Sequence, residues 1–168
     1  LPKLRAAKPD GVFVAAETQD GSILVKQFKE FGIQTKIFGV GSWATSDFIG
    51  LTGDASEGIY AAVPYASSMP GERNQSFVQY YSAAYKEKPG KYGAAGYNAL
   101  NIVMEAIARA GNTQADAIRD ALRKTDYAAP NGHFKFTEKG EGYGFDVVLV
   151  QIQNREPKVV AQSPTERP

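Results

Sequence analysis

The chain has 168 residues, of which 43% are hydrophobic and 22% are charged, and its formal net charge is +1. This composition is ordinary for a globular protein with one domain or two small lobes, and no basic stretch favours nucleic acid as a partner. The absence of cysteine and the single histidine exclude disulfides, thiol catalysis, zinc–thiolate sites and a multi-histidine metal site.

The first third of the chain has the pattern of alternating strands and helices. Strands are expected over residues 11–16, 35–40 and 58–63, and the first is a continuous apolar run, which is typical of a strand buried on both faces of a parallel sheet. Residues 24–31 repeat apolar side chains at i, i+4 and i+7, which predicts an amphipathic helix between the first two strands. A weaker helix is expected near residues 47–51, so the order predicts a parallel β-α-β-α-β sheet.

The middle of the chain is predicted to be helical. Residues 65–71 are small, polar and turn-prone, and they suggest a boundary. Helices are then expected over residues 74–86 and 93–110, with Gly111 ending the second of them. A third helix is expected to open at Asn112–Thr113, because Thr113 and Asp116 have the spacing of a capping box.

The last part of the chain returns to strand patterns. Asn131–Gly132 is a turn signal, and alternating side chains predict strands near residues 134–136, 145–150 and 158–162. These changes of pattern divide the chain into three predicted segments: residues 1–66, 67–130 and 131–168. Strands separated by a helical insertion indicate a chain that leaves one lobe and later returns to it.

Four stretches, in this order, resemble type I periplasmic solute-binding proteins of the branched-chain amino-acid ABC transporters. They are PDGVFVAAETQDGSILVKQFKEFGIQTKIFGVGSW, SEGIYAAVPY, YGAAGYNALNIVMEAIARAG and NGHFKFTEKGEG. The resemblance extends over nearly the whole chain and is to the C-terminal half of that family. The helical spacing of residues 1–7 agrees with it, because we expect these residues to end a helix that begins outside the chain.

The resemblance implies an α/β fold that is part of a two-lobed molecule, with a parallel-sheet, Rossmann-like lobe and helices of a second lobe. By this mapping, residues 1–66 form the second half of the C-terminal lobe, 67–130 belong to the N-terminal lobe and 131–168 return to the C-terminal lobe. The implied function is capture of an amino acid or a related carboxylate or amide, in the periplasm or otherwise outside the cytoplasm, by closure of the lobes. The implied partners are a membrane permease and the missing N-terminal half, with self-association of the fragment; no enzyme activity and no cofactor are expected.

Open parallel sheets bind ligands beyond the carboxyl ends of their strands, and two loops of this chain follow such ends. Glu17 and Thr18 follow the first predicted strand. The carboxylate of Glu17 has the chemistry to accept a charge-assisted hydrogen bond from an α-ammonium group. In the family, the acidic residue with this role commonly follows the next strand, where this chain has Gly41. Either Glu17 takes the role, or the ligand lacks an ammonium group, or Glu17 is a solvated loop residue.

The other candidate ligand contacts are Gly41, Ser42 and Trp43 after the second strand, and Tyr92 and Tyr97 near the start of the long helix. The tryptophan would form the wall of an apolar pocket, or else would pack between loop and lobe. The resemblance implies that aromatic residues near the start of the long helix approach the cleft, although Tyr97 also fits the apolar stripe of that helix. The hydroxyl groups of Thr18 and Ser42 would contact ligand or cap helices.

Two other functions are compatible with parts of the sequence. Residues 39–44 match the dinucleotide-binding pattern G-x-G-x-x-A after a strand. Against this enzyme hypothesis, Gly50 and Gly53 interrupt the following helix, and no acidic residue ends the next strand to hold a ribose. The second alternative is a ligand-sensing receptor domain of the same fold. The lone His133 has no neighbouring group that suggests catalysis.

Overall fold

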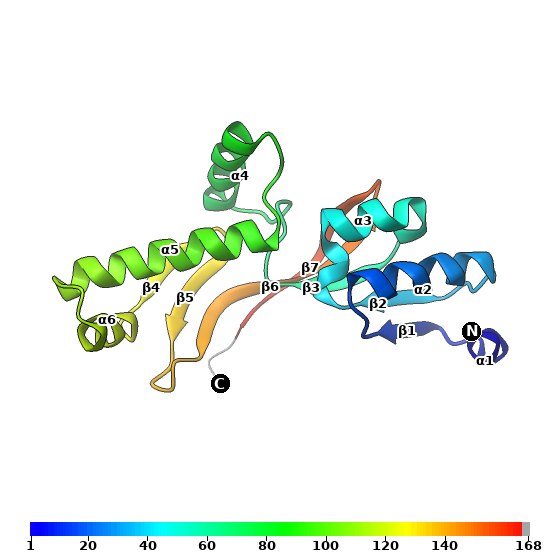
Figure 1. Ribbon diagram of the computed structural model, residues 1–168, viewed down its shortest axis with the longest axis horizontal. Helices are drawn as coiled ribbons and strands as arrows, with labels where there is room; N and C mark the ends of the chain where they lie inside the picture. Colours follow the sequence, from blue (N-terminus) through cyan, green and yellow to red (C-terminus); the bar gives the residue numbers. More distant parts are fainter. Residues whose placement is uncertain (166–168) are drawn as a thin grey trace. The chain divides into compact units, whose positions relative to one another are not determined.

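The computed structural model describes residues 1–165, and the chain divides into two compact units, each of which is described separately (Figure 1). Unit 1 comprises Leu1–Ser68 and Val148–Ala161. Unit 2 comprises Met69–Val147 and resumes at Gln162. The strand β6 (Gly142–Gln153) contributes its first half to unit 2 and its second half to unit 1. Among the described residues, no helix combines the length and apolar character needed to span a membrane.

Unit 1 is a sheet with helices between its strands. Its elements are α1 (Pro2–Ala7), β1 (Gly11–Val14), α2 (Thr18–Glu30), β2 (Lys36–Gly39), the 3-10 helices η1 (Gly41–Ala44) and η2 (Gly53–Ser56), α3 (Ser46–Thr52), β3 (Tyr60–Val63) and parts of β6 and β7 (Glu156–Pro164). The strands β1, β2 and β3 are parallel, and β6 joins β3 antiparallel. The predicted β-α-β-α-β order is therefore confirmed.

The helices α2 and α3 lie on one face of this sheet (Figure 1). The buried cluster beneath them includes Val25 of α2, Trp43 of η1, Phe48 of α3 and Ile152 of β6. The prediction that the first strand is buried on both faces is wrong, because Phe13 on β1 is 70% exposed. Both crossover connections lead in the same direction along the sheet, so their helices cover the same face and leave the other face of β1 open.

Unit 2 is a helical layer beside an antiparallel sheet. Its elements are α4 (Glu72–Tyr85), α5 (Lys91–Ala110), α6 (Ala115–Leu122), β4 (Asp126–Ala129), β5 (Gly132–Phe136) and the first half of β6. The three strands pair in the order β4, β5, β6. The predicted stop of the long helix is confirmed, because Gly111 has φ 70° and its N–H donates to Ile107 O at 3.0 Å.

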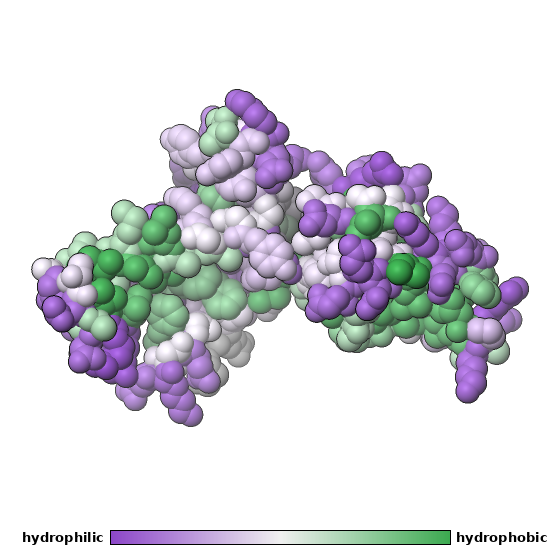
Figure 2. Space-filling view, in the orientation of Figure 1, coloured by the Kyte–Doolittle hydropathy of each residue, from purple (hydrophilic) through white to green (hydrophobic). Residues whose placement is uncertain are grey.

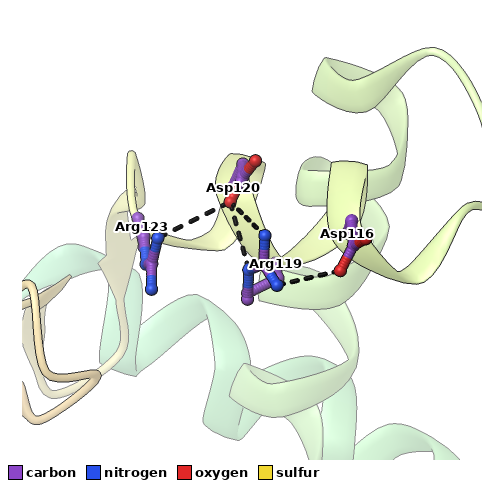
Figure 3. Close-up of polar contacts among 4 residues, drawn as sticks. All are labelled: Asp116, Arg119, Asp120 and Arg123. Atoms are coloured by element: carbon purple, nitrogen blue, oxygen red, sulfur yellow. Dashed lines mark hydrogen bonds and ion pairs between the residues drawn. The ribbon is translucent and has the colours of Figure 1, made fainter.

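The start of α6 differs from the prediction. The helix begins at Ala115 with Gln114 as its N-cap, and no side chain caps it. Instead, the side-chain oxygen of Asn112 accepts from the backbone N–H of Gln114 at 2.9 Å, which turns the chain just before the helix. Asp116, expected to take part in a capping box, pairs with Arg119 at 2.8 Å, and Asp120 bridges Arg119 and Arg123 (Figure 3).

The boundary expected at residues 130 and 131 also differs from the division of the structure. Residues 131–147 group with the helical part, because β5 pairs antiparallel with β4 across a turn at residues 130 and 131. The other boundary, between Ser68 and Met69, lies close to the predicted one at residue 66. The assignment of the three segments to particular lobes stays a prediction, and residues 166–168 of the last segment lie outside the described part of the chain.

Candidate functional site

The candidate residues of unit 1 lie where β1 and β2 end. Because these two strands are parallel neighbours, their carboxyl ends share one edge of the sheet. Glu17 and Thr18 follow β1, and Gly41, Ser42 and Trp43 follow β2 within η1. The structure therefore brings together the two loops that the sequence singled out, although contact with a ligand stays a prediction.

Glu17 places a carboxylate at this edge that no described residue neutralises. It is the N-cap of α2 with φ −67° and ψ 170°, and its backbone carbonyl accepts from the N–H of Gly21 at 2.8 Å. Its side chain is exposed, does not cap the helix and makes no ion pair or hydrogen bond among residues 1–165. The sequence AAET of residues 15–18 and VGS of residues 40–42 contains no lysine or arginine. The charge contributed by these two loops is therefore negative.

Ser42 contributes a hydroxyl group that lacks a partner. Its Oγ is buried and forms no hydrogen bond within the described part of the chain. The expectation that Thr18 or Ser42 caps a helix is wrong, because the hydroxyl of Thr45 caps α3 instead, accepting from Phe48 N at 3.4 Å. Buried polar groups are nearly always hydrogen-bonded in native proteins. The Ser42 hydroxyl is thus a buried polar group for which the described residues supply no partner.

Trp43 does not form the wall of an open pocket. Its side chain is 0% exposed and stacks on Phe48 with ring centroids 4.8 Å apart. Its indole Nε1 donates to the backbone carbonyl of Ala16 at 2.8 Å, across from η1 to the loop after β1. The ring is thus a core group with no surface left for a ligand, and the prediction that it contacts ligand is corrected to the packing alternative.

A shallow hollow of about 600 Å³ lies beside the first turns of α2 and α3. Its lining residues are Thr18, Gln19, Ser46, Asp47, Gly50 and Leu51. Of the predicted site residues in unit 1, only Thr18 belongs to this lining. The side chains that line the hollow at the starts of the two helices are polar.

The two predicted tyrosines belong to unit 2. Tyr92 lies in the first turn of α5 and is 71% exposed, with the ammonium of Lys91 4.7 Å from its ring centroid. Tyr97 stands one and a half turns further along and packs on Phe77 of α4, with ring centroids 4.7 Å apart. Tyr92 is thus open to solvent, whereas Tyr97 is partly packed between α4 and α5.

Tyr97 also lines a cavity of about 570 Å³ that the sequence did not predict. Aromatic and charged side chains of α4, α5 and β4 form it: Glu72, Arg73, Ser76, Phe77, Tyr80, Tyr97, Tyr127, Ala128 and Pro130. Burial, with smaller contributions from Tyr97 and Glu105, raises the pKa of Tyr127 to about 12, so this hydroxyl stays protonated. The aromatic spacing of residues 77–81 was the available signal, but it is equally the pattern of a helix core.

The first glycine of the dinucleotide-like pattern has another structural cause. A Cβ on Gly39 would lie 2.2 Å from Cε3 of Trp43, so the absence of a side chain makes room for the indole ring. The last four residues of the pattern form the 3-10 helix η1, and the helix that follows, α3, has only seven residues where a long α-helix would be needed. Among the described residues, no cluster of three or more His, Cys, Asp or Glu side chains could hold a metal ion.

Comparisons with known proteins agree with this architecture. The family model described as periplasmic binding protein matches residues 1–157. A leucine-, isoleucine-, valine-, threonine- and alanine-binding protein of Pseudomonas aeruginosa is 25% identical over 151 residues, which cover 90% of this chain and 40% of that protein.

Solved structures are similar in fold at lower sequence identity. A leucine-binding protein from Thermotoga maritima has a TM-score of 0.86 and 22% identity, covering 97% of this chain and 48% of that one. A solute-binding protein of an ABC transporter from R. palustris, solved in complex with benzoate, has a TM-score of 0.84 and 20% identity, covering 99% of this chain and 47% of that one. This chain thus spans less than half the length of these relatives.

Proposed function

The chain belongs to the periplasmic binding protein family, and from this premise we propose that it is part of the solute-binding component of an ABC transporter. In this role it captures an amino acid or a similar small solute outside the cytoplasm and delivers it to a membrane permease. The relatives described above are binding proteins, and capture requires no covalent chemistry and no cofactor.

One observation carries the assignment of an amino acid as the solute class. Glu17 presents an unpaired carboxylate in the loop after β1, and Ser42, in the loop after the neighbouring strand β2, has a buried hydroxyl without a partner among the described residues. An α-ammonium group would satisfy that carboxylate by charge-assisted hydrogen bonds. An aromatic carboxylate such as benzoate would meet repulsion from the same group, because the two loops contribute no cation.

Capture by closure of two lobes explains how such an exposed group could give affinity. A solute that contacts both lobes binds the closed state better than the open state and shifts the population toward it. The apparent affinity then depends on the fraction of molecules that can close. We therefore expect Glu17 to contribute fully only in a protein that contains both lobes.

The test is a thermal-shift screen of the complete gene product that contains these 168 residues, against amino acids, amides and aromatic carboxylates. A solute that binds the native state stabilises it by about 2.7 kcal/mol at a concentration of 100 times Kd. We expect an amino acid to raise the melting temperature, and Glu17→Gln to weaken its binding by about tenfold or more, because the hydrogen bond to a charged group is lost.

Glu30→Gln is the matched control, because Glu30 is an exposed glutamate at the far end of the same helix. It should leave the shift unchanged. Stabilisation by benzoate that Glu17→Gln does not reduce would refute the amino-acid assignment and leave solute capture standing. If no solute of these classes acts but a nicotinamide dinucleotide does, the transporter function is wrong.

A further inference from the structure

Trp43 joins the two candidate loops of unit 1 without reaching the surface. We propose that Trp43 is a positioning residue that holds the Glu17 loop against the Ser42 loop, so that the carboxylate and the hydroxyl keep a fixed spacing. The role of these two groups in binding rests on the function proposed above. The physical link between the loops rests on the geometry of the indole ring alone.

The first part of that geometry is the indole hydrogen bond. Nε1 of Trp43 donates to the carbonyl of Ala16 at 2.8 Å, and Ala16 directly precedes Glu17. This contact joins residues 27 positions apart and connects η1 with the loop after β1. A carbonyl that lost this partner inside the protein would be left unsatisfied, which costs more than the net value of the bond itself. The bond therefore fixes the backbone at Ala16, directly before Glu17.

The second part is the fit of the ring between two glycines. A Cβ on Gly21, the fourth residue of α2, would lie 2.5 Å from ring atoms of Trp43. A Cβ on Gly39, at the end of β2, would lie 2.2 Å from the ring. Phe48 stacks on the ring at 4.8 Å. The indole is thus held by three elements and cannot shift without moving one of them.

Together these contacts explain how an exposed loop can be well positioned. Loops at strand ends are ordinarily the mobile part of an α/β fold. Here the residue before Glu17 is bonded to a ring that is itself immobilised in the core. Binding groups that are held in place before the ligand arrives cost less ordering entropy when it binds.

The decisive experiment removes the N–H and keeps the ring. Trp43 is the only tryptophan of the chain, so growth of a tryptophan auxotroph on 3-benzothienylalanine replaces this one N–H with sulfur. The readout is exchange of the Gly21 amide, which donates to the Glu17 carbonyl at 2.8 Å. We expect this amide to exchange about tenfold faster in the substituted chain, since the Ala16 carbonyl loses its partner.

The Ile49 amide is the internal control. It donates to Thr45 O at 3.1 Å in α3, on the other side of the same cluster, and does not depend on the indole N–H. Its exchange should be unchanged. Unchanged protection of Gly21 would overturn the proposal, and so would equal acceleration of both amides, which would show only a general loosening of the core.

A second arm links the position of Glu17 to binding in the complete gene product. With the amino acid identified by the thermal-shift screen, Trp43→Phe should weaken binding about tenfold in the native protein. It should have little further effect when Glu17→Gln is already present, because Trp43 acts through Glu17. Fully additive effects would contradict this link. Absence of any bound solute would refute the proposed function, while the amide comparison would still decide the positioning role.

Discussion

At the scale of single residues, the close approach of Trp43 to Gly39 sets a strict limit on substitution. A Cβ at Gly39 would lie 2.2 Å from Cε3 and 2.4 Å from Cδ2 of the ring. The ring is fully buried, so it cannot move aside without disturbing the cluster around it. We expect Gly39→Ala to lower the free energy of unfolding by about 1–3 kcal/mol through overpacking. Urea denaturation of the two chains measures this difference.

Gly50→Ala is the matched control for that substitution. Gly50 lies within α3, and a Cβ there would meet nothing within 4 Å. Alanine should therefore stabilise the helix by about 0.5–1 kcal/mol relative to glycine. If the two substitutions change the stability equally, the packing of Trp43 against Gly39 is not what constrains this position.

The sequence placed several candidate site residues at strand ends but did not determine their roles. Glu17 and Ser42 could be placed at strand ends because strand periodicity and the rule for parallel sheets suffice for that step. Trp43 could not be assigned, because its burial depends on Gly21 and Gly39, which lie on other elements. A contact of this kind is a property of three-dimensional packing and leaves no local pattern.

At the scale of elements, the hairpin of β4 and β5 carries a pH-dependent interaction. Asp126 on β4 accepts from His133 Nδ1 at 3.1 Å and pairs with Lys135 Nζ at 3.2 Å, both on β5. The hydrogen bond with His133, and then that with Lys135, hold the pKa of the Asp126 carboxyl below its ordinary value. A lowered folded-state pKa means stabilisation that is present above the unfolded pKa and is lost as pH falls through the folded one.

Asp126→Asn should therefore be destabilising at about pH 5, and the difference from the native chain should shrink as the pH falls below about 4, the ordinary pKa of an aspartate, toward the lower folded-state pKa. The effect should be small, because all three side chains are exposed to solvent. Thermal unfolding at low ionic strength over this range measures it. Asp10→Asn, at an exposed aspartate without an ion pair in the described chain, should show no such trend. The interaction would be refuted by a difference that grows as the solution is acidified.

The existence of most elements was predictable, whereas their ends and one strand were not. Apolar periodicity predicted the helices α2, α4 and α5, because each buries one regular face, and short apolar runs predicted the strands β1, β2 and β3. The strand β4 was missed, since Asp126, Ala128 and Ala129 are poor strand formers. The turn at Asn131 was recognised, and a hairpin turn requires a strand on each side, so the signal for β4 was present.

At the scale of the whole molecule, the resemblance gave the family and the α/β fold, which the comparisons confirm. The grouping of residues 131–147 with the helical part was not predictable, because it depends on the pairing of β5 with β4. Which strand pairs with which depends on packing against the neighbouring strand, and the local sequence does not determine it. A strand shared by two units, as β6 is, cannot be divided from its sequence alone.

The surface of unit 2 has an apolar face that the described residues do not cover. Large hydrophobic side chains of α5 are exposed there, with Leu100 at 62%, Met104 at 57%, Tyr97 at 44% and Val103 at 40%. Figure 2 shows hydrophobic surface over this helix. The opposite face of α5 is buried against the sheet and includes Ile102. A helix that is apolar on both faces is ordinarily buried on both, so this surface favours association.

We therefore expect the 168-residue chain to self-associate through α5 when it is studied alone. Leu100→Glu combined with Met104→Lys should return it to a monomer in sedimentation equilibrium, with little loss of stability, because both side chains are exposed and the new pair has the favourable i, i+4 order. Ile23→Glu with Phe31→Lys removes two comparably exposed apolar groups from unit 1 and should leave association unchanged. A native chain that stays monomeric throughout a dilution series and binds no hydrophobic dye would contradict this expectation. In the complete gene product, the same double substitution should instead destabilise the fold if a further segment packs on α5, because two charges would then lose their hydration in an apolar interface.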